Sequence, residues 1–288
     1  MKMPVVLAFV LAIVPATCGA QITTNVFTRV LHLRTGANET ATGFTIAVDG
    51  REYLITAKHA VGSLGQDAKI GIEQNSAWVN IPVKIYKCDD PVDIAVLIPP
   101  YQLTYDLPLP NENSNFMYGQ DAYFLGFPYN LGGPVGPNGA YPMPFVKRSL
   151  ISVVEPVDAS RKASVYLLDG YNNPGFSGGP LVAKDNSKPG FNYDVIAVVT
   201  GFEPEVVPVV TSHAIESPDK GSEKSKEQPW RIRRNPDGSY IEYVDTENSA
   251  VLNTGIVTAF SLQPAIDLIR KHPEGPEEKT LTAQPVLK

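Results

Sequence analysis

Residues 173–182 read NPGFSGGPLV. Three glycines and two prolines surround one serine, Ser177, and such a composition holds the backbone in a tight and unusual path. Because glycine tolerates positive φ, successive N–H groups in this segment can converge on one point. Acyl transfer needs this arrangement, in which donors for an oxyanion lie beside a nucleophilic hydroxyl. Ser177 is therefore a candidate nucleophile, and the N–H groups of Gly175 and Ser177 are candidate oxyanion donors.

A serine hydroxyl is a weak nucleophile until a base accepts its proton. The chain has four histidines, and His59 lies in LITAKHAV, where an apolar strand gives way to a polar loop. His213 lies in a polar segment and His272 near the end of the chain, so we expect both at the surface. His32 alternates with leucines, and we expect it to face outward from a strand. His59 is therefore the candidate base.

An imidazole base needs a carboxylate that orients it and stabilises its protonated form. Residues 89–98 read DDPVDIAVLI. Asp93 directly precedes a five-residue apolar strand, which places it at the rim of a sheet, whereas Asp89 and Asp90 fit a solvated turn. Asp93 is therefore the candidate third member of a catalytic triad.

Most of the chain consists of short runs rich in Val, Ile, Tyr and Phe, which 26 prolines and 23 glycines interrupt too often for long helices. The pattern predicts an antiparallel all-β fold, closed into a barrel or sandwich. Asp49-Gly50 fits a tight hairpin turn between two strands. One short C-terminal helix is expected at Gln263–Lys271, with Ser261 as its cap. The predicted strands are Gly43–Val48, Tyr53–Thr56, Val79–Lys87, Ile94–Ile98, Asp121–Gly126, Arg148–Val154, Ser164–Leu168, Gly179–Ala183, Tyr193–Gly201 and Gly255–Phe260.

Two segments are too polar for a core. Residues 204–249 are expected to form a mobile excursion from the barrel, with a hairpin at residues 235–238, which read NPDG. The basic cluster at residues 231–234 fits a solvated loop in this excursion. Residues 271–288 are expected to form a flexible tail.

The first twenty residues fit a cleaved signal peptide. Lys2 gives a positive start, Val5–Val14 is apolar, and small residues end the segment at Ala20. The apolar run is too short to span a bilayer of about 30 Å, so we expect a secreted or periplasmic protein without a stable membrane anchor. A lipoprotein attached through Cys18 is the alternative.

Composition argues against several other classes of protein. After cleavage at Ala20 the chain keeps one cysteine, Cys88, so it has no internal disulfide, and a buried structural thiol is expected. A net charge of −6 argues against nucleic acid as a partner. The histidines are scattered, and neither a metal-binding motif nor a phosphate-binding glycine loop occurs, so we expect no metal and no cofactor. No feature specifies an oligomeric state.

Three motifs in the order His, Asp, Ser resemble the trypsin-like, chymotrypsin-fold serine peptidases. They are TAKHAV around His59, DIAVL from Asp93 and GFSGGPL around Ser177, with intervals of 34 and 84 residues. The resemblance is nearest to the bacterial high-temperature-requirement proteases, whose serine motif also begins Asn-Pro-Gly. FLGFP at residues 124–128 and GIVTAF at residues 255–260 also resemble that group. The similarity covers roughly residues 27–270, and no PDZ-sized segment follows residue 270 in this sequence.

The resemblance implies two antiparallel six-stranded β-barrels, about residues 27–110 and 118–262, in one peptidase domain at residues 21–270. The triad would lie in the cleft between the barrels. A polypeptide substrate would pair with the edge at Thr200, Gly201 and Phe202, and Asn172 would line its pocket. The residue before the serine is Phe176, where digestive-type members carry an aspartate, so activity is expected without processing beyond signal removal. The excursion at residues 204–249 falls where the family builds one wall of its specificity pocket, so cleavage preference is not carried over.

Two other interpretations remain open. GFSGG also matches the nucleophile elbow of α/β-hydrolase esterases, although that fold needs a helix after the serine, and here the sequence is strand-like. The second interpretation is a catalytically silent module that keeps a protease fold for binding, because fold alone does not establish function.

Overall fold

The computed structural model describes residues 22–104, 116–136, 139–157, 163–185, 187, 193–220 and 230–279. Two α-helices and three short 3₁₀ helices occur in these ranges: α1 (Thr24–Phe27), α2 (Gln263–Lys271), η1 (His59–Val61), η2 (Pro128–Asn130) and η3 (Pro218–Lys220). The strands are β1 (Val30–Arg34), β2 (Thr40–Val48), β3 (Arg51–Ala57), β4 (Asp67–Gln74), β5 (Ala77–Lys87), β6 (Ile94–Ile98), β7 (Asp121–Gly126), β8 (Phe145–Pro156), β9 (Ser164–Asp169), β10 (Pro180–Lys184), β11 (Tyr193–Ile215), β12 (Arg231–Arg234) and β13 (Tyr240–Ser261).

Strands β1 to β6 close into the first barrel, in the order β1-β2-β3-β6-β5-β4, with antiparallel pairing throughout. The β2–β3 hairpin turns at Asp49 and Gly50, whose φ angles of 49° and 74° suit the tight turn that this pair predicts. Strand β4 was not predicted, because its first half is polar and exposed and only its middle is apolar and buried.

The second barrel is built from β7, β8, β9, β13, β11 and β10. These strands are neighbours in a sheet whose order is β11-β10-β7-β8-β9-β13-β12, and an additional β11–β13 pairing completes a circuit of six. Strand β12 is attached to β13 outside this circuit. The predicted all-β architecture of two six-stranded barrels with a short C-terminal helix is confirmed.

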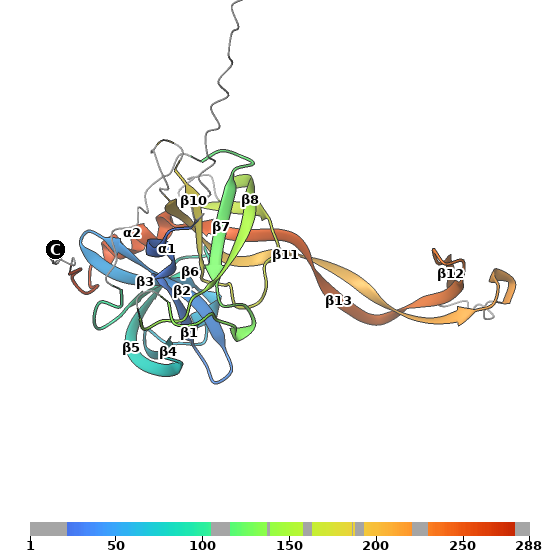
Figure 1. The fold of residues 1–288 in the computed structure, drawn as a ribbon, viewed down its shortest axis with the longest axis horizontal. Helices are drawn as coiled ribbons and strands as arrows, with labels where there is room; N and C mark the ends of the chain where they lie inside the picture. Colours follow the sequence, from blue (N-terminus) through green and yellow to red (C-terminus); the bar gives the residue numbers. More distant parts are fainter. Residues whose placement is uncertain are drawn as a thin grey trace, which may run out of the picture.

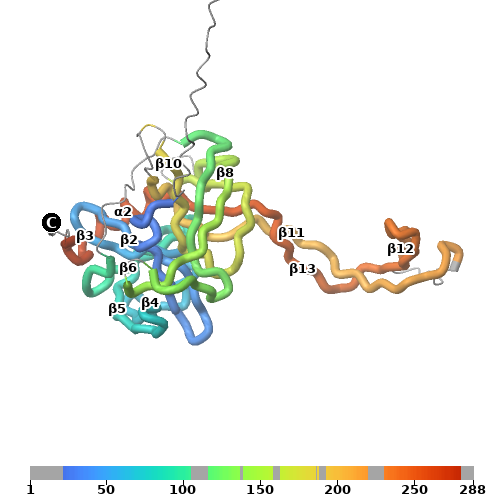
Figure 2. Tube along the Cα trace, in the orientation of Figure 1, coloured from blue at the N-terminus to red at the C-terminus, as the bar shows by residue number. Residues whose placement is uncertain are grey.

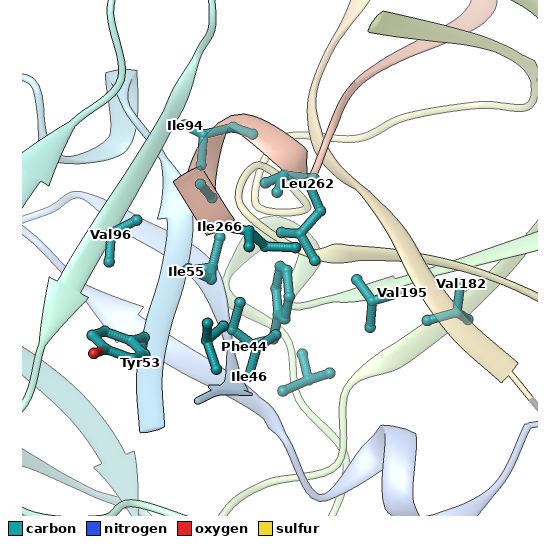
Figure 3. Close-up of a cluster of buried hydrophobic side chains, with 14 of the residues drawn as sticks. Phe44, Ile46, Tyr53, Ile55, Ile94, Val96, Val182, Val195, Leu262 and Ile266 are labelled. Atoms are coloured by element: carbon teal, nitrogen blue, oxygen red, sulfur yellow. The ribbon is translucent and has the colours of Figure 1, made fainter. Parts of the chain in front are cut away.

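The two barrels share one hydrophobic core (Figure 3). Phe44, Ile55 and Val96 from the first barrel meet Val182 and Val195 from the second, and all five side chains are buried. Leu262 and Ile266 of the helical segment close the same cluster. Neighbouring residues along a strand point to opposite faces, so Leu54, beside Ile55, fills the interior of the first barrel instead. Strand β3 is consequently apolar on both faces.

His32 corrects one expectation from the sequence. Its ring is 1% exposed and stacks on Phe127 of the second barrel at 4.5 Å between centroids. Alternation with leucines placed it correctly on the face opposite the first barrel's interior, but the second barrel covers that face. Nδ1 lies 2.7 Å from Glu73 Oε2, and burial lowers the pKa of the imidazole.

Beyond the barrels, β11 and β13 continue as a twisted two-stranded ribbon that projects far from the body, with β12 near its end (Figures 1 and 2). The ladder runs from the Pro204–Asn253 pair to the Ile215–Tyr240 pair. The hairpin at residues 235–238 is confirmed, and the basic cluster lies on β12, an exposed strand, where the sequence predicted a loop. The polar composition of this segment did not predict these strands. A projecting ribbon has no buried face, so its sequence does not show the alternation of apolar and polar residues that marks a half-buried strand. Residues 221–229 of the predicted excursion lie outside the described residues.

Helix α2 has the predicted bounds, but Ser261 does not cap it. Leu262 is the N-cap, and Ser261 Oγ accepts a hydrogen bond from Ser164 N–H. After α2 the chain lies along the first barrel, where we expected a flexible tail. Glu52 N–H donates to the Pro276 carbonyl, and Arg51 Nη1 donates to the Gly275 carbonyl at 2.6 Å. Residues 280–288 lie outside the described residues, as does the predicted signal peptide at residues 1–20.

Cys88 is a free, buried cysteine, as the sequence predicts. Desolvation raises the pKa of its thiol to about 12, so the thiol stays protonated and weakly reactive near neutral pH. Of the helices in the described ranges, none combines the length and the apolar character that crossing a membrane requires.

Candidate active site

The register between β3 and β6 brings His59 and Asp93 together. Ala57, the last residue of β3, pairs with Ile94, the first residue of β6. Asp93 therefore lies beside the start of η1, and its carbonyl accepts a hydrogen bond from Lys58 N–H. The apolar strands that precede His59 and follow Asp93 hold both residues at the rim of the first barrel.

Both oxygens of the Asp93 carboxylate contact His59. Oδ2 lies 2.6 Å from His59 Nδ1, and Oδ1 accepts the backbone N–H of His59 at 2.8 Å. This double contact fixes the imidazole and leaves Nε2 on the side away from the carboxylate. The His59 side chain is 49% exposed and that of Asp93 is 24% exposed, so the pair is accessible from solvent.

Ser177 lies in the serine loop, residues 170–179, which connects β9 and β10 of the second barrel. Gly175 and Gly178 on either side of it have φ angles of +104° and +87°, a region that side chains rarely adopt. A Cβ on Gly178 would lie 2.1 Å from the Thr42 carbonyl oxygen and 2.2 Å from Thr56 Oγ1. The serine loop therefore needs glycine at 178 both for its backbone angle and for its close approach to the first barrel.

Hydrogen bonds hold the carbonyl groups of this loop. Tyr129 N–H donates to the Pro174 carbonyl at 2.8 Å, and Gly179 N–H donates to the Phe176 carbonyl at 2.9 Å. Within the described part of the chain, the N–H groups of Gly175 and Ser177 have no acceptor. These two N–H groups belong to the peptide units whose carbonyls are held, so their orientation is fixed as well.

A cleft of about 620 Å³ joins the two halves of the site. His59 and Glu39 line it from the first barrel, and Tyr129, Gly175 and Ser177 line it from the second. The structure thus brings together the candidate base, the candidate nucleophile and both residues whose N–H groups the sequence singled out as oxyanion donors, and Asp93 lies directly behind the base.

The predicted substrate-binding residues lie around Ser177 without lining this cleft. Thr200, Gly201 and Phe202 belong to β11, and the Thr200 carbonyl lies 3.4 Å from Ser177 Oγ. Asn172 is 3% exposed, and its Nδ2 donates to the Gly201 carbonyl at 2.8 Å. Its side chain therefore connects the serine loop to β11.

Charged groups near the site are held by local contacts. The Lys58 ammonium bonds to Asp90 Oδ1 at 2.7 Å and lowers the pKa of that exposed carboxyl. Lys147 Nζ donates to the Tyr171 carbonyl and to Asn173 Oδ1, and burial lowers the pKa of its ammonium. Where the structure describes the chain, no group of three or more His, Cys, Asp or Glu side chains is arranged to hold a metal ion.

Sequence reasoning missed the residues that support the serine loop from outside it. Thr42, Tyr129 and Lys147 each bond to the loop, but they lie in three separate segments of the chain. The sequence around Thr42 gives little indication of this contact, because threonine is common in strands and looks there like an ordinary strand residue.

The family model described as "Trypsin-like peptidase domain" matches residues 41–188, which are more than half of the chain. The chain belongs to this family. The matched range of the trypsin-like peptidase domain contains His59, Asp93 and Ser177. No curated protein was found to match the sequence.

Solved structures show the same fold at low sequence identity. The HtrA-type protease AlgW, solved with a tripeptide, is 17% identical to this trypsin-like chain, with a TM-score of 0.50, and the match covers 86% of this chain and 61% of that one. A serine endoprotease from Yersinia pestis is 20% identical, with a TM-score of 0.45, over 62% of this chain and 56% of that one. This chain thus spans about three fifths of the length of these two proteins.

The packing at Gly178 gives a direct test of the loop geometry. Replacing Gly178 with Ala should destabilise the protein by about 2–5 kcal/mol, because left-handed strain and overpacking add together. Gly50→Ala is the matched control: its φ is +74°, but nothing lies within 4 Å of the added Cβ. It should cost about 1 kcal/mol. Urea unfolding measures both, and equal losses would contradict the close approach at Gly178.

Proposed function

We propose that this chain is a serine endopeptidase that hydrolyses peptide bonds through an acyl-enzyme intermediate. The observation that carries the proposal is the two-point contact between Asp93 and His59, at a cleft that His59 shares with Ser177. A carboxylate fixed on Nδ1 leaves Nε2 of the imidazole as the acceptor for a serine proton. Membership of the trypsin-like peptidase family supports the same chemistry.

In the proposed reaction, Ser177 Oγ attacks the scissile carbonyl carbon while His59 Nε2 accepts the hydroxyl proton. The Asp93 carboxylate stabilises the imidazolium that forms. The N–H groups of Gly175 and Ser177 donate to the oxyanion of the tetrahedral intermediate. His59 then gives its proton to the leaving amine, and water releases the acyl group by the same steps in reverse.

The β11 segment at Thr200, Gly201 and Phe202 supports an extended polypeptide as substrate. It directly follows the stretch of β11 that pairs with β10, which ends at Val198. On its other side it pairs with β13. An edge in this position offers main-chain groups to a substrate strand beside Ser177, the mode called β-augmentation.

One contact favours a second candidate, a protease-fold module that binds peptides without cleaving them. Among the described residues no hydrogen bond joins Ser177 to His59, and Ser177 Oγ has the Thr200 carbonyl as its partner at 3.4 Å. For a working peptidase, substrate binding would have to bring Ser177 Oγ from the Thr200 carbonyl to His59, since catalytic hydrogen bonds are often long before substrate binds.

Substituting the proposed nucleophile decides between these functions. Ser177→Ala should abolish labelling by a fluorophosphonate probe and lower the cleavage of unfolded casein by about 10⁶-fold. Ser63→Ala, which changes another serine of the same cleft, should leave both near wild type. If the well-folded wild type gives neither signal, the peptidase proposal is wrong and the binding module is favoured.

The proposed role of Asp93 predicts a loss of rate without a loss of fold. Asp93→Asn should lower kcat about 10⁴-fold, because an amide stabilises neither the required tautomer nor the imidazolium. Asp90→Asn is the matched control, since Asp90 is 96% exposed and contacts Lys58 instead of His59. Steady-state kinetics and circular dichroism measure rate and fold. A folded Asp93→Asn protein with wild-type kcat would exclude the triad.

We also propose that residues 1–20 direct export and are removed. The positive start, short apolar run and small residues before Gln21 motivate this proposal. The mature protein from a bacterial periplasm or culture medium should begin at Gln21, as determined by N-terminal sequencing and intact mass. An N-terminal lipid on Cys18 would instead establish the lipoprotein alternative, and a full-length cytoplasmic product would exclude export.

A further inference from the structure

Thr42 is the one residue of the first barrel that bonds the serine loop through both its side chain and its main chain. Its Oγ1–H donates to the Gly175 carbonyl at 2.6 Å, and its backbone N–H donates to the Ser177 carbonyl at 3.0 Å. The two carbonyls lie on either side of Phe176. The described residues offer no other contact that holds the loop on both sides at once.

The side-chain bond acts on the peptide unit that links the two proposed oxyanion donors. Gly175 adopts a φ of +104°, and a glycine has little steric preference for one orientation of its peptide groups. The carbonyl of Gly175 could therefore rotate towards the cleft at small conformational cost. The buried Thr42 hydroxyl donates its proton to this carbonyl, which keeps the carbonyl turned towards the first barrel and fixes the peptide unit between the two donor N–H groups.

Thr42 is itself held firmly enough for this task. It is fully buried on β2, opposite His32 in the β1–β2 ladder. Thr56 Oγ1 donates to its carbonyl at 2.7 Å, and Phe127 N–H donates to its Oγ1 at 3.0 Å. The Phe127 bond occupies an acceptor position of the hydroxyl, so the hydroxyl proton is directed to Gly175. Thr42 thus connects Phe127, the N-cap of η2, with β3 and the serine loop.

We propose that Thr42 is a positioning residue for the oxyanion site, which acts by fixing the orientation of the Gly175–Phe176 peptide group. The inference rests on the proposed peptidase function and deepens it. Thr42 does not touch substrate. Its hydroxyl holds the peptide unit that lies between the two units carrying the Gly175 and Ser177 N–H groups, and a misplacement of about 1 Å at such a site can cost about 100-fold in rate.

Three substitutions separate positioning from simple stability. Thr42→Val keeps the shape and removes the hydroxyl, and it should lower kcat on a cleaved peptide about 100-fold while KM changes less than about three-fold. Thr42→Ser keeps the hydroxyl and should restore kcat to within about three-fold of wild type. Thr45→Val is the matched control, because Thr45 is equally buried on β2 but bonds to Thr104, away from the serine loop.

The proposal is overturned if folded Thr42→Val keeps the wild-type kcat, if Thr42→Ser does not restore it, or if Thr45→Val loses as much. Should Thr42→Val not fold, Thr42→Cys supplies a weaker donor of similar size, and an intermediate kcat is expected. A wild-type kcat in Thr42→Cys would count against the proposal.

Crystal structures of the wild type and of the valine or cysteine variant separate this inference from the proposed function. Loss of the Thr42 hydroxyl should leave the Gly175 carbonyl rotated from its wild-type direction, whether or not the protein cleaves casein. An inert wild type with a rotated variant peptide would reject the peptidase function and keep the positioning role. An unchanged peptide orientation would reject the positioning role by itself.

Discussion

Packing between the two barrels is the constraint on which the rest of the structure depends. Phe44 and Ile55 from one barrel and Val182 and Val195 from the other form a single buried cluster, and α2 closes it. Close-packed interiors fix the relative position of the parts that share them, because side chains interlock and leave few voids. The proposed catalytic groups come from different barrels, so their separation is set by this apolar contact. The chemistry at the cleft is therefore specified by residues that take no part in it.

At the cleft, the same contact brings main chain against main chain. The Thr42 N–H reaches the Ser177 carbonyl, and Gly178 fits under the Thr42 carbonyl only because it lacks a Cβ. The serine loop is thus bonded to the first barrel, while Gly175 and Ser177, whose N–H groups have no acceptor among the described residues, line the cleft. A site of this kind is organised before substrate arrives, which is what stabilisation of a developing charge requires.

The parts of the structure that the sequence predicted are those whose signal is local. Strands such as Ile94–Ile98 carry an uninterrupted apolar run, and NPGFSGGPLV is unusual enough to mark a candidate nucleophile. The missed parts depend on distant partners. His32 is buried only because the second barrel covers it, Thr42 gains its role from Gly175 more than 130 positions away, and the ribbon of β11 and β13 has no buried face to show alternation. A contact between two segments that lie far apart in the sequence does not change the spacing of apolar residues within either segment, so hydrophobic periodicity cannot predict it.

The segment after α2 gives the fold a particular order of assembly. Arg51 and Gly275 are hydrogen-bonded partners that lie 224 positions apart in the chain. All six strands of the first barrel have been synthesised once Ile98 is made, yet the stretch that lies along the start of β3 is synthesised only after the last strand of the second barrel. Contacts of such long sequence separation form late, since the entropy of closing the loop must be overcome first. The first barrel is therefore completed by residues that follow the second barrel in the chain, and a chain interrupted anywhere before residue 275 leaves the start of β3 uncovered.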